Sequence, residues 1–164
     1  MPPVPSERTV TEMGEKVGNV PKNTYSQSYR RLRRETRFDT LDLASRLKHL
    51  VSIYVMNEKR VPKRWRYMVG KPTIDYARTI RDCISAANDI RIDGNPTGEA
   101  LAERAALQRR ALSYCNILQL QLIDITEECD GATPESVRAM SEIILDLTRK
   151  IPRWAKSDGG RPGG

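Results

Sequence analysis

A stripe of apolar side chains between Thr133 and Lys156 restricts that segment to a helix that packs against other helices. The members of the stripe follow one another in steps of three or four residues: Val137, Met140, Ile144, Leu147, Ile151 and Trp154. This spacing places them on one side of an α-helix, as in a bundle or a coiled coil. Thr133 supplies an N-cap, Pro134 suits the first helical position, and Glu135 lies near the positive end of the helix dipole. We therefore predict a helix from Thr133 to Lys156.

Three more segments have helical periodicity, and strand signals are nearly absent. The first spans about 36–57, with arginines at 30–34 that could extend it backwards. The second ends near Ile92 and begins near Arg64 or at Pro72, because a proline either starts a helix or kinks it. The third spans 98–129. The expected inner faces are Leu43, Ala44, Leu47, Leu50, Val51 and Tyr54; then Ala77, Ile80, Ile84 and Ala87; then Ala111, Cys115, Leu118, Leu122, Ile125 and Cys129.

The connections between these helices are short and contain turn residues. Gly94 and Gly131 each precede a proline, and each glycine could adopt the left-handed conformation that ends a helix. Short connections favour antiparallel neighbours, so we predict an all-α, up-down-up-down four-helix bundle over residues 29–157. Residues 1–28 are expected to form a flexible N-terminal arm, and residues 158–164 a flexible Gly-rich tail.

The third helix carries a second apolar side, which predicts self-association. Ile117, Leu120 and Ile123 lie off its main stripe. A helix that is apolar on two sides usually packs on two sides. A symmetric closed ring of subunits is one way to cover such a surface.

Basic side chains outnumber acidic ones and give a formal net charge of +7. This balance favours an anionic partner, with RNA or DNA first and an acidic protein second. Up-down topology brings the start of the first helix and the end of the last helix to one pole. The candidate nucleic-acid-binding residues at this pole are Arg30, Arg31, Arg33, Arg34, Arg37, Arg149, Lys150, Arg153 and Lys156. Those at the other pole are Lys59, Arg60, Lys63, Arg64 and Arg66, beside an acidic hairpin of Asp124, Glu127, Glu128, Asp130 and Glu135.

No set of residues with catalytic or cofactor-binding spacing is evident. His49 is the only histidine, and no glycine-rich phosphate loop is present. The three cysteines have no metal-binding spacing and are expected to be buried and reduced. No apolar run is long enough for a membrane span, and the N-terminus has no apolar signal core. We therefore predict a cytoplasmic protein without catalytic residues, metal, cofactor or membrane segment.

Two aromatic residues, Trp65 and Tyr67, alternate with the cations Lys63, Arg64 and Arg66. Such residues could stack on bases while the cations neutralise phosphates. Trp65 and Trp154 could equally close the ends of the bundle. The sequence leaves both readings open.

Three segments resemble the Avd-like four-helix bundle proteins, the accessory variability determinants of diversity-generating retroelements, which are related to proteins encoded in 23S rRNA intervening sequences. The segments are Val61-Pro62-Lys63-Arg64-Trp65-Arg66-Tyr67, Ala86-Ala87-Asn88-Asp89-Ile90-Arg91, and 143–157 with its ending Ile151-Pro152-Arg153-Trp154-Ala155-Lys156. The likeness covers roughly residues 36–158. It implies a homopentameric barrel without catalytic residues, whose basic surface binds nucleic acid and a reverse transcriptase. Lys63, Arg64, Arg66, Arg153 and Lys156 would belong to that surface.

The expected function is therefore that of a non-enzymatic retroelement accessory protein. It would hold template RNA, complementary DNA and reverse transcriptase together during mutagenic reverse transcription. The alternative is a basic interaction adaptor that docks an acidic protein. A small nuclease or RNA-modifying enzyme is the third class that the sequence leaves open.

Overall fold

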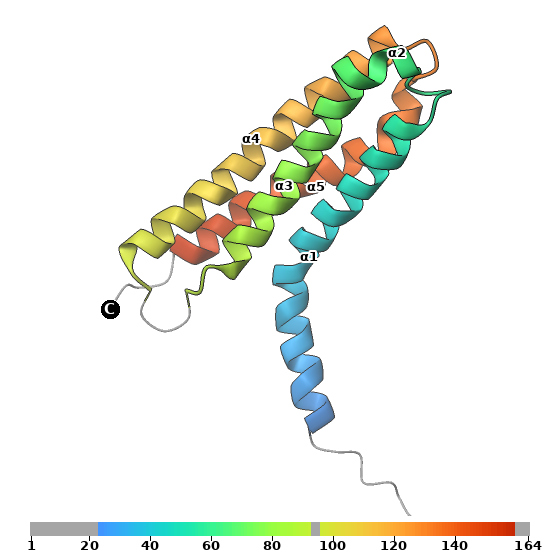
Figure 1. Ribbon diagram of the computed structural model, residues 1–164. Coiled ribbons are helices and arrows are strands. Elements are labelled where there is room, and N and C mark those ends of the chain that lie inside the picture. The colour runs from blue at the N-terminus through green and yellow to red at the C-terminus, as the bar shows by residue number, and fades with distance from the viewer. Residues whose placement is uncertain (1–22, 93–95, 160–164) are drawn as a thin grey trace, which may run out of the picture.

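The computed structural model describes residues 23–92 and 96–159, with side chains from Asp39 onward. It consists of α1 (Asn23–Met56), α2 (Lys63–Trp65), the π-helical turn η1 (Arg66–Gly70), α3 (Lys71–Asp89), α4 (Gly98–Glu128) and α5 (Pro134–Gly159). Figure 1 shows α3, α4, α5 and the second half of α1 lying along one another. No strand occurs in the described residues. The all-α prediction is confirmed.

Each long helix has two neighbours. α1 packs against α3 and α5, and α4 packs against the same two helices from the other side. Two contacts show how α1 and α5 are aligned. The Tyr54 and Ser136 hydroxyl groups lie 2.9 Å apart near the end of α1 and the start of α5. Lys150, farther along α5, pairs with Asp39, which lies earlier in α1.

The core lies where the apolar stripes of the four long helices meet. Every predicted inner residue of α3 and α4 is buried, and in α1 only Leu43 and Leu50 are half-buried. In α5, Val137, Met140, Ile144, Leu147 and Ile151 are buried, and Trp154 packs half-buried against the same core. The periodicity therefore placed the core correctly. Thr133 caps α5 as predicted, because its hydroxyl accepts the Ser136 amide at 3.2 Å.

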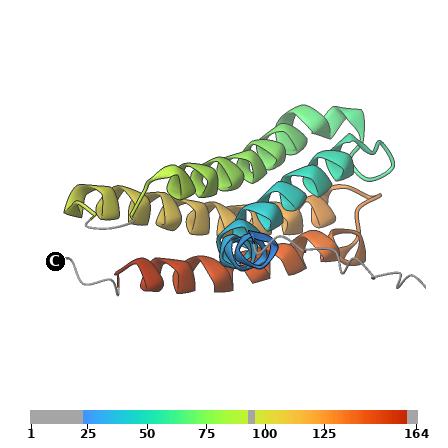
Figure 2. The same cartoon turned by 90° about the horizontal axis from the view of Figure 1, so that it is seen from below.

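The first and last helices extend farther toward the two ends of the chain than predicted. α1 begins at Asn23, within the segment assigned to the arm, and no proline or glycine interrupts it before Met56. Figures 1 and 2 show its first turns extending away from α3, α4 and α5. At the other end, α5 runs through Gly159, and Asp158, assigned to the tail, is only 7% exposed.

Pro72 lies inside one continuous helical stretch that runs from Lys63 to Asp89. The π-helical turn η1 precedes it, and the Lys71 amide donates to the Arg66 carbonyl, five residues back. Pro72 has no backbone N–H, so one hydrogen bond of the helix is missing there, and the wider π-helical turn accommodates this break. Pro72 is therefore the second residue of α3, and the helical stretch continues backwards through η1 to Lys63.

Gly131 is needed for a close approach between two loops. A Cβ atom at this position would lie 1.7 Å from the Lys59 carbonyl oxygen, and the Gly131 φ angle is outside the left-handed region. The prediction of a left-handed cap at Gly131 is therefore wrong, because the α4–α5 loop is instead packed against the loop after α1. Gly94 lies outside the described residues. None of the helices in the described ranges is long and apolar enough to cross a membrane.

Candidate nucleic-acid interface

The predicted pole that joins the two ends of the chain is only partly assembled. Arg30, Arg31, Arg33, Arg34 and Arg37 belong to α1, but their side chains lie outside the described residues. The backbone that carries them belongs to the first half of α1, which extends away from the other helices in Figure 1. The predicted juxtaposition of this group with the end of α5 is therefore not seen. Lys150 of α5 instead pairs with Asp39.

Three cations near the end of α5 form an exposed row. Arg149, Arg153 and Lys156 are all exposed, and their steps of four and three residues place them on one outward side of the helix. Among the side chains that the structure describes, no carboxylate lies within ion-pair distance of any of the three. We call these residues the α5 cation row.

Arg138, about three turns before this row, has a different environment. Its guanidinium group contacts Glu142 at 3.1 Å and Glu135 at 3.3 Å. Hydrogen bonds to Glu142 and Glu135 raise the pKa of Arg138. Its charge is thus matched locally, whereas the charges of the α5 cation row are not.

At the other predicted pole, part of the cationic set stabilises the fold. Arg60 donates to the Gly131 carbonyl at 3.0 Å, and Arg66 donates to the Met56 carbonyl at 2.6 Å. Lys63 lies 3.2 Å from Glu58, which Arg66 also approaches at 3.7 Å. Lys59 and Arg64 are exposed and have no ion pair within the described residues. The five cations of this pole therefore do not present a uniform surface.

The acidic hairpin does not neutralise these cations by ion pairs. Within residues 39–92 and 96–159, Glu135 pairs with Arg138 of its own helix, and none of the five cations at this pole pairs with a hairpin carboxylate. A hydrogen bond from Arg60 to the Gly131 backbone carbonyl instead connects the cationic segment with the loop of the hairpin.

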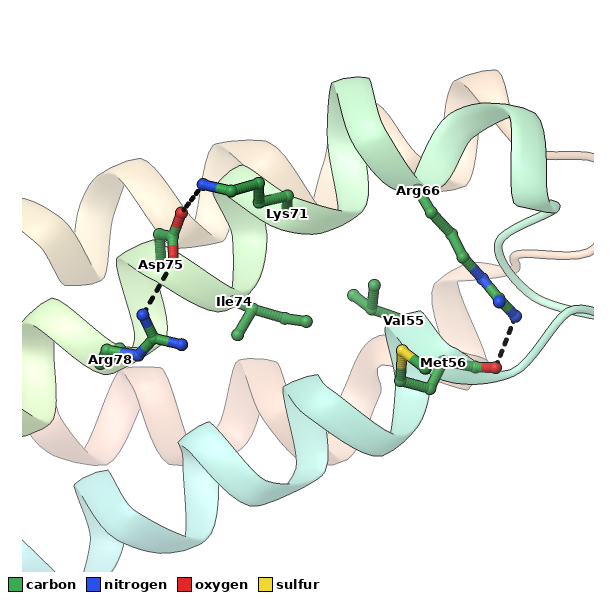
Figure 3. Close-up of a pocket in the computed structure, with 7 residues that line it drawn as sticks. All are labelled: Val55, Met56, Arg66, Lys71, Ile74, Asp75 and Arg78. Carbon is green, nitrogen blue, oxygen red and sulfur yellow. Dashed lines mark hydrogen bonds and ion pairs between the residues drawn. The ribbon is translucent and has the colours of Figure 1, made fainter.

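A groove of about 320 Å³ lies between the end of α1 and the start of α3 (Figure 3). Val55, Met56 and Ile74 form its apolar part. On one side, Asp75 accepts from Lys71 at 2.8 Å and from Arg78 at 3.3 Å. The hydrogen bond from Lys71 lowers the pKa of Asp75. Figure 3 shows Arg66 on the opposite side, turned toward the Met56 carbonyl. The groove has an apolar floor and a charged rim, without a nucleophile and base in contact.

The structure separates the aromatic residues into two roles. Trp65 and Trp154 are half-buried and pack against the core, and both indole Nε1 atoms are buried without a hydrogen-bond partner. Tyr67 is 81% exposed. The two tryptophans thus belong to the ends of the bundle, and Tyr67 remains accessible to a partner.

A buried polar cluster that we did not predict joins α3, α4 and α5. Arg104 is 2% exposed, and its Nε donates to Asp158 Oδ2 at 2.8 Å. Its Nη1 donates to the carbonyls of Ala87 and Ile90, both at 2.9 Å. Gln108 Nε2 donates to the same Asp158 oxygen at 2.8 Å, and the Arg104 guanidinium lies 4.9 Å from the centre of the Trp154 ring. This cluster is part of the fold rather than of an exposed site.

Histidine, cysteine and acidic residues do not form a metal-binding cluster in the described part of the chain. No group of three or more histidine, cysteine or acidic residues there could hold a metal ion. All three cysteines are buried as predicted, and none forms a disulfide in the structure. Burial raises the pKa of Cys115 to about 12. His49 is exposed on α1. The absence of enzymatic activity stays a prediction.

Comparison with known proteins adds no assignment. No protein-family model, curated protein or solved structure matches the chain significantly. The resemblance to Avd-like bundles therefore stays a prediction that depends on the three sequence segments described above.

Proposed function

We propose that this chain is a nucleic-acid-binding accessory protein of a diversity-generating retroelement, without catalytic activity of its own. The observation that carries the proposal is the α5 cation row of Arg149, Arg153 and Lys156. These side chains share one exposed side of α5, and none has an ion pair among the described residues. Cations in this state gain the most from contact with phosphates, because no local carboxylate must be displaced.

The geometry of the row suits a phosphate backbone. At 1.5 Å per residue, the seven-residue step from Arg149 to Lys156 spans about 10 Å. Along that length a DNA duplex carries about six phosphate charges. Phosphate contacts position a protein without reading sequence, so binding is expected to be salt-sensitive and weakly sequence-specific. The net charge of +7 supports the same kind of partner.

As part of this proposal, the antiparallel bundles assemble into a ring, with a pentamer as the expected number of subunits. Ile117, Leu120 and Ile123 of α4 are 38%, 63% and 43% exposed, which supports an association surface there. Leu145 of α5 is 49% exposed. It lies one turn beyond Ser141, which receives a hydrogen bond from Gln119 of α4 at 3.2 Å. Light scattering at micromolar concentration tests the assembly, and a monomer of 18.6 kDa would overturn the ring.

The reverse-transcriptase partner follows from the sequence resemblance. The accessory protein would hold the enzyme and its template RNA or complementary DNA on one assembly. Co-purification with a reverse transcriptase encoded in the same locus, beside near-identical template and variable repeats, tests this role. A locus without such an enzyme would contradict it.

The nucleic-acid test is a fluorescence-anisotropy titration against duplex DNA and single-stranded RNA between about 50 and 200 mM salt. The test variant carries Arg149→Gln, Arg153→Gln and Lys156→Gln. The matched control carries Arg78→Gln, Arg81→Gln and Arg138→Gln, which removes equal charge from arginines already paired with Asp75, Asp82 and Glu135 or Glu142.

We expect the α5 variant to lower the slope of log K against log salt by about 2–3 for duplex DNA, since each lost phosphate contact contributes about 0.9. The control should retain a slope close to that of the unmodified chain. Equal weakening by both variants would assign the effect to net charge alone and contradict the proposed interface. Binding that does not respond to salt would overturn the proposal itself.

A further inference from the structure

Tyr67 is a large aromatic side chain that the fold leaves uncovered. It is 81% exposed, although Trp65, two residues earlier in the same helical stretch, packs against the core. No hydrogen bond or ring contact involves Tyr67 within the described residues. A ring that is this exposed is open to a stacking partner.

Two cations lie one helical turn before and after this ring. Lys63 and Lys71 are four residues from Tyr67 on either side, and their side chains are 75% and 67% exposed. The hydrogen bond with Asp75 raises the pKa of Lys71, so this amine stays charged. Lys63 pairs with Glu58 and Lys71 with Asp75, but exposed ion pairs of this kind are weak. A phosphate can therefore compete for either amine.

The turn that carries Tyr67 is held firmly against α1. Arg66, the preceding residue, donates to the Met56 carbonyl at 2.6 Å. Gly70 lies so close to α1 that a Cβ atom there would be 2.6 Å from Val55 Cγ1. The π-helical geometry of η1 is itself uncommon and occurs frequently at functional sites. The ring is thus presented on a fixed base, which reduces the entropy lost when a partner binds.

We infer that Tyr67 stacks on an unpaired base of single-stranded RNA or DNA, with Lys63 and Lys71 contacting the flanking phosphates. The inference rests on the proposed function and adds a preference for single strands. In a duplex the faces of the bases are covered by their neighbours, whereas an unpaired base has a face that an aromatic side chain can cover. The α5 cation row would contact the phosphates of single-stranded and duplex nucleic acid alike. In this inference, Tyr67 is the residue that distinguishes single strands from duplexes.

The test uses oligothymidine and oligouridine strands of about 12 nucleotides, within the range of known single-strand sites, and a DNA duplex of the same length. Their affinities are measured for Tyr67→Ala, Tyr67→Phe and Met68→Ala. Met68 is the matched control, because it is the adjacent residue, is 70% exposed and has no aromatic face. Thermal unfolding verifies that each variant remains folded.

We expect Tyr67→Ala to weaken single-strand binding about 5- to 150-fold, from the measured range for loss of one stacked base. Duplex affinity should not change, and Tyr67→Phe and Met68→Ala should bind single strands like the unmodified chain. Loss with one of the two strands alone supports the inference and identifies the strand that is recognised.

Single-strand binding that survives Tyr67→Ala would overturn the inference. An equal loss in Met68→Ala would also overturn it, because binding would then not depend on an aromatic ring. In both cases salt-sensitive duplex binding through the α5 cation row would show that the proposed function still holds. Absence of binding to every strand would instead refute the proposed function.

Discussion

Replacing Asp158 by alanine tests the buried polar cluster directly. Asp158 is the carboxylate that faces Arg104, and Arg104 is only 2% exposed. In Asp158→Ala the guanidinium group keeps the carbonyls of Ala87 and Ile90 but loses its counter-charge. Gln108 loses the acceptor of its side-chain amide as well. The variant therefore leaves one buried charge and one buried donor without their partner.

The expected cost follows from the contacts that disappear. Asp158 Oδ2 accepts from Arg104 Nε and from Gln108 Nε2, both at 2.8 Å, and a longer contact of 3.4 Å joins Arg104 Nη2 to Oδ1. Hydrogen bonds to charged groups contribute about 1.5–3 kcal/mol each, and breaking a buried pair on one side costs about 3–5 kcal/mol. We expect Asp158→Ala to lower the free energy of unfolding by about 3–5 kcal/mol. For a chain of this size the melting temperature falls by about 6–20 °C.

Urea denaturation followed by circular dichroism measures this change, with Asp146→Ala as the control. Asp146 is an exposed aspartate of the same helix and has no ion pair within the described residues, so its loss should cost less than about 0.5 kcal/mol. In a double-mutant cycle, Arg104→Met and Asp158→Ala together should cost about 1–3 kcal/mol less than the sum of the single changes. An Asp158→Ala cost below about 1 kcal/mol, or additive single changes, would refute the reasoning.

Two further predictions concern loop packing and pH. Gly131→Ala should destabilise the chain by at least about 2 kcal/mol in urea denaturation, because the new Cβ meets the Lys59 carbonyl at 1.7 Å. Gly98→Ala, where nothing lies within 4 Å, should be neutral or stabilising by up to about 1 kcal/mol, and similar losses in both would contradict the assigned clash. The free energy of unfolding should fall as pH rises above about 9, since burial raises the pKa of Cys115 to about 12 and the folded chain keeps a proton that the unfolded chain loses. The fall should be shallower in Cys115→Ala, and an unchanged pH slope in that variant would contradict the assignment.

The core was predictable because apolar side chains repeat at helical spacing along each long helix. In α4, Ala111, Cys115, Leu118, Leu122 and Ile125 are completely buried. Such a stripe is buried only when its side of the helix faces the core, so the periodicity alone identifies the inner face. The ends of α1 and α5 were less predictable, since charged turns without a stripe carry no signal for where a helix stops packing.

The buried polar cluster was missed because its residue types are usually exposed. Arg104 and Gln108 precede Ala111 by seven and three residues, and Asp158 follows Ile151 by seven. These positions continue the apolar stripes of α4 and α5, so their register could have marked them as inward-facing. We expected these side chains to be exposed because they are polar or charged. That expectation fails when an opposite charge faces such a side chain inside the fold.

For the candidate site, the sequence identified the basic residues but not their partners. Arg60 and Arg66 contact backbone carbonyls, and Lys150 contacts a carboxylate on another helix, which no local pattern indicates. The exposure of Tyr67 depends on the π-helical turn, which shifts the register between Trp65 and α3. Contacts that form across helices thus decide which charges and rings remain available.

The placement of Arg104 and Asp158 also limits how α4 and α5 can align. If α5 slid along α4 by one turn, about 5.4 Å, the Arg104 guanidinium group and the Asp158 carboxylate would lose their contact. Apolar contacts alone tolerate such a shift, since one leucine or isoleucine replaces another along the seam. One charged layer at the end of the bundle therefore selects a single vertical alignment of the two helices, and with it the spacing at which the outward cations of α5 meet a partner.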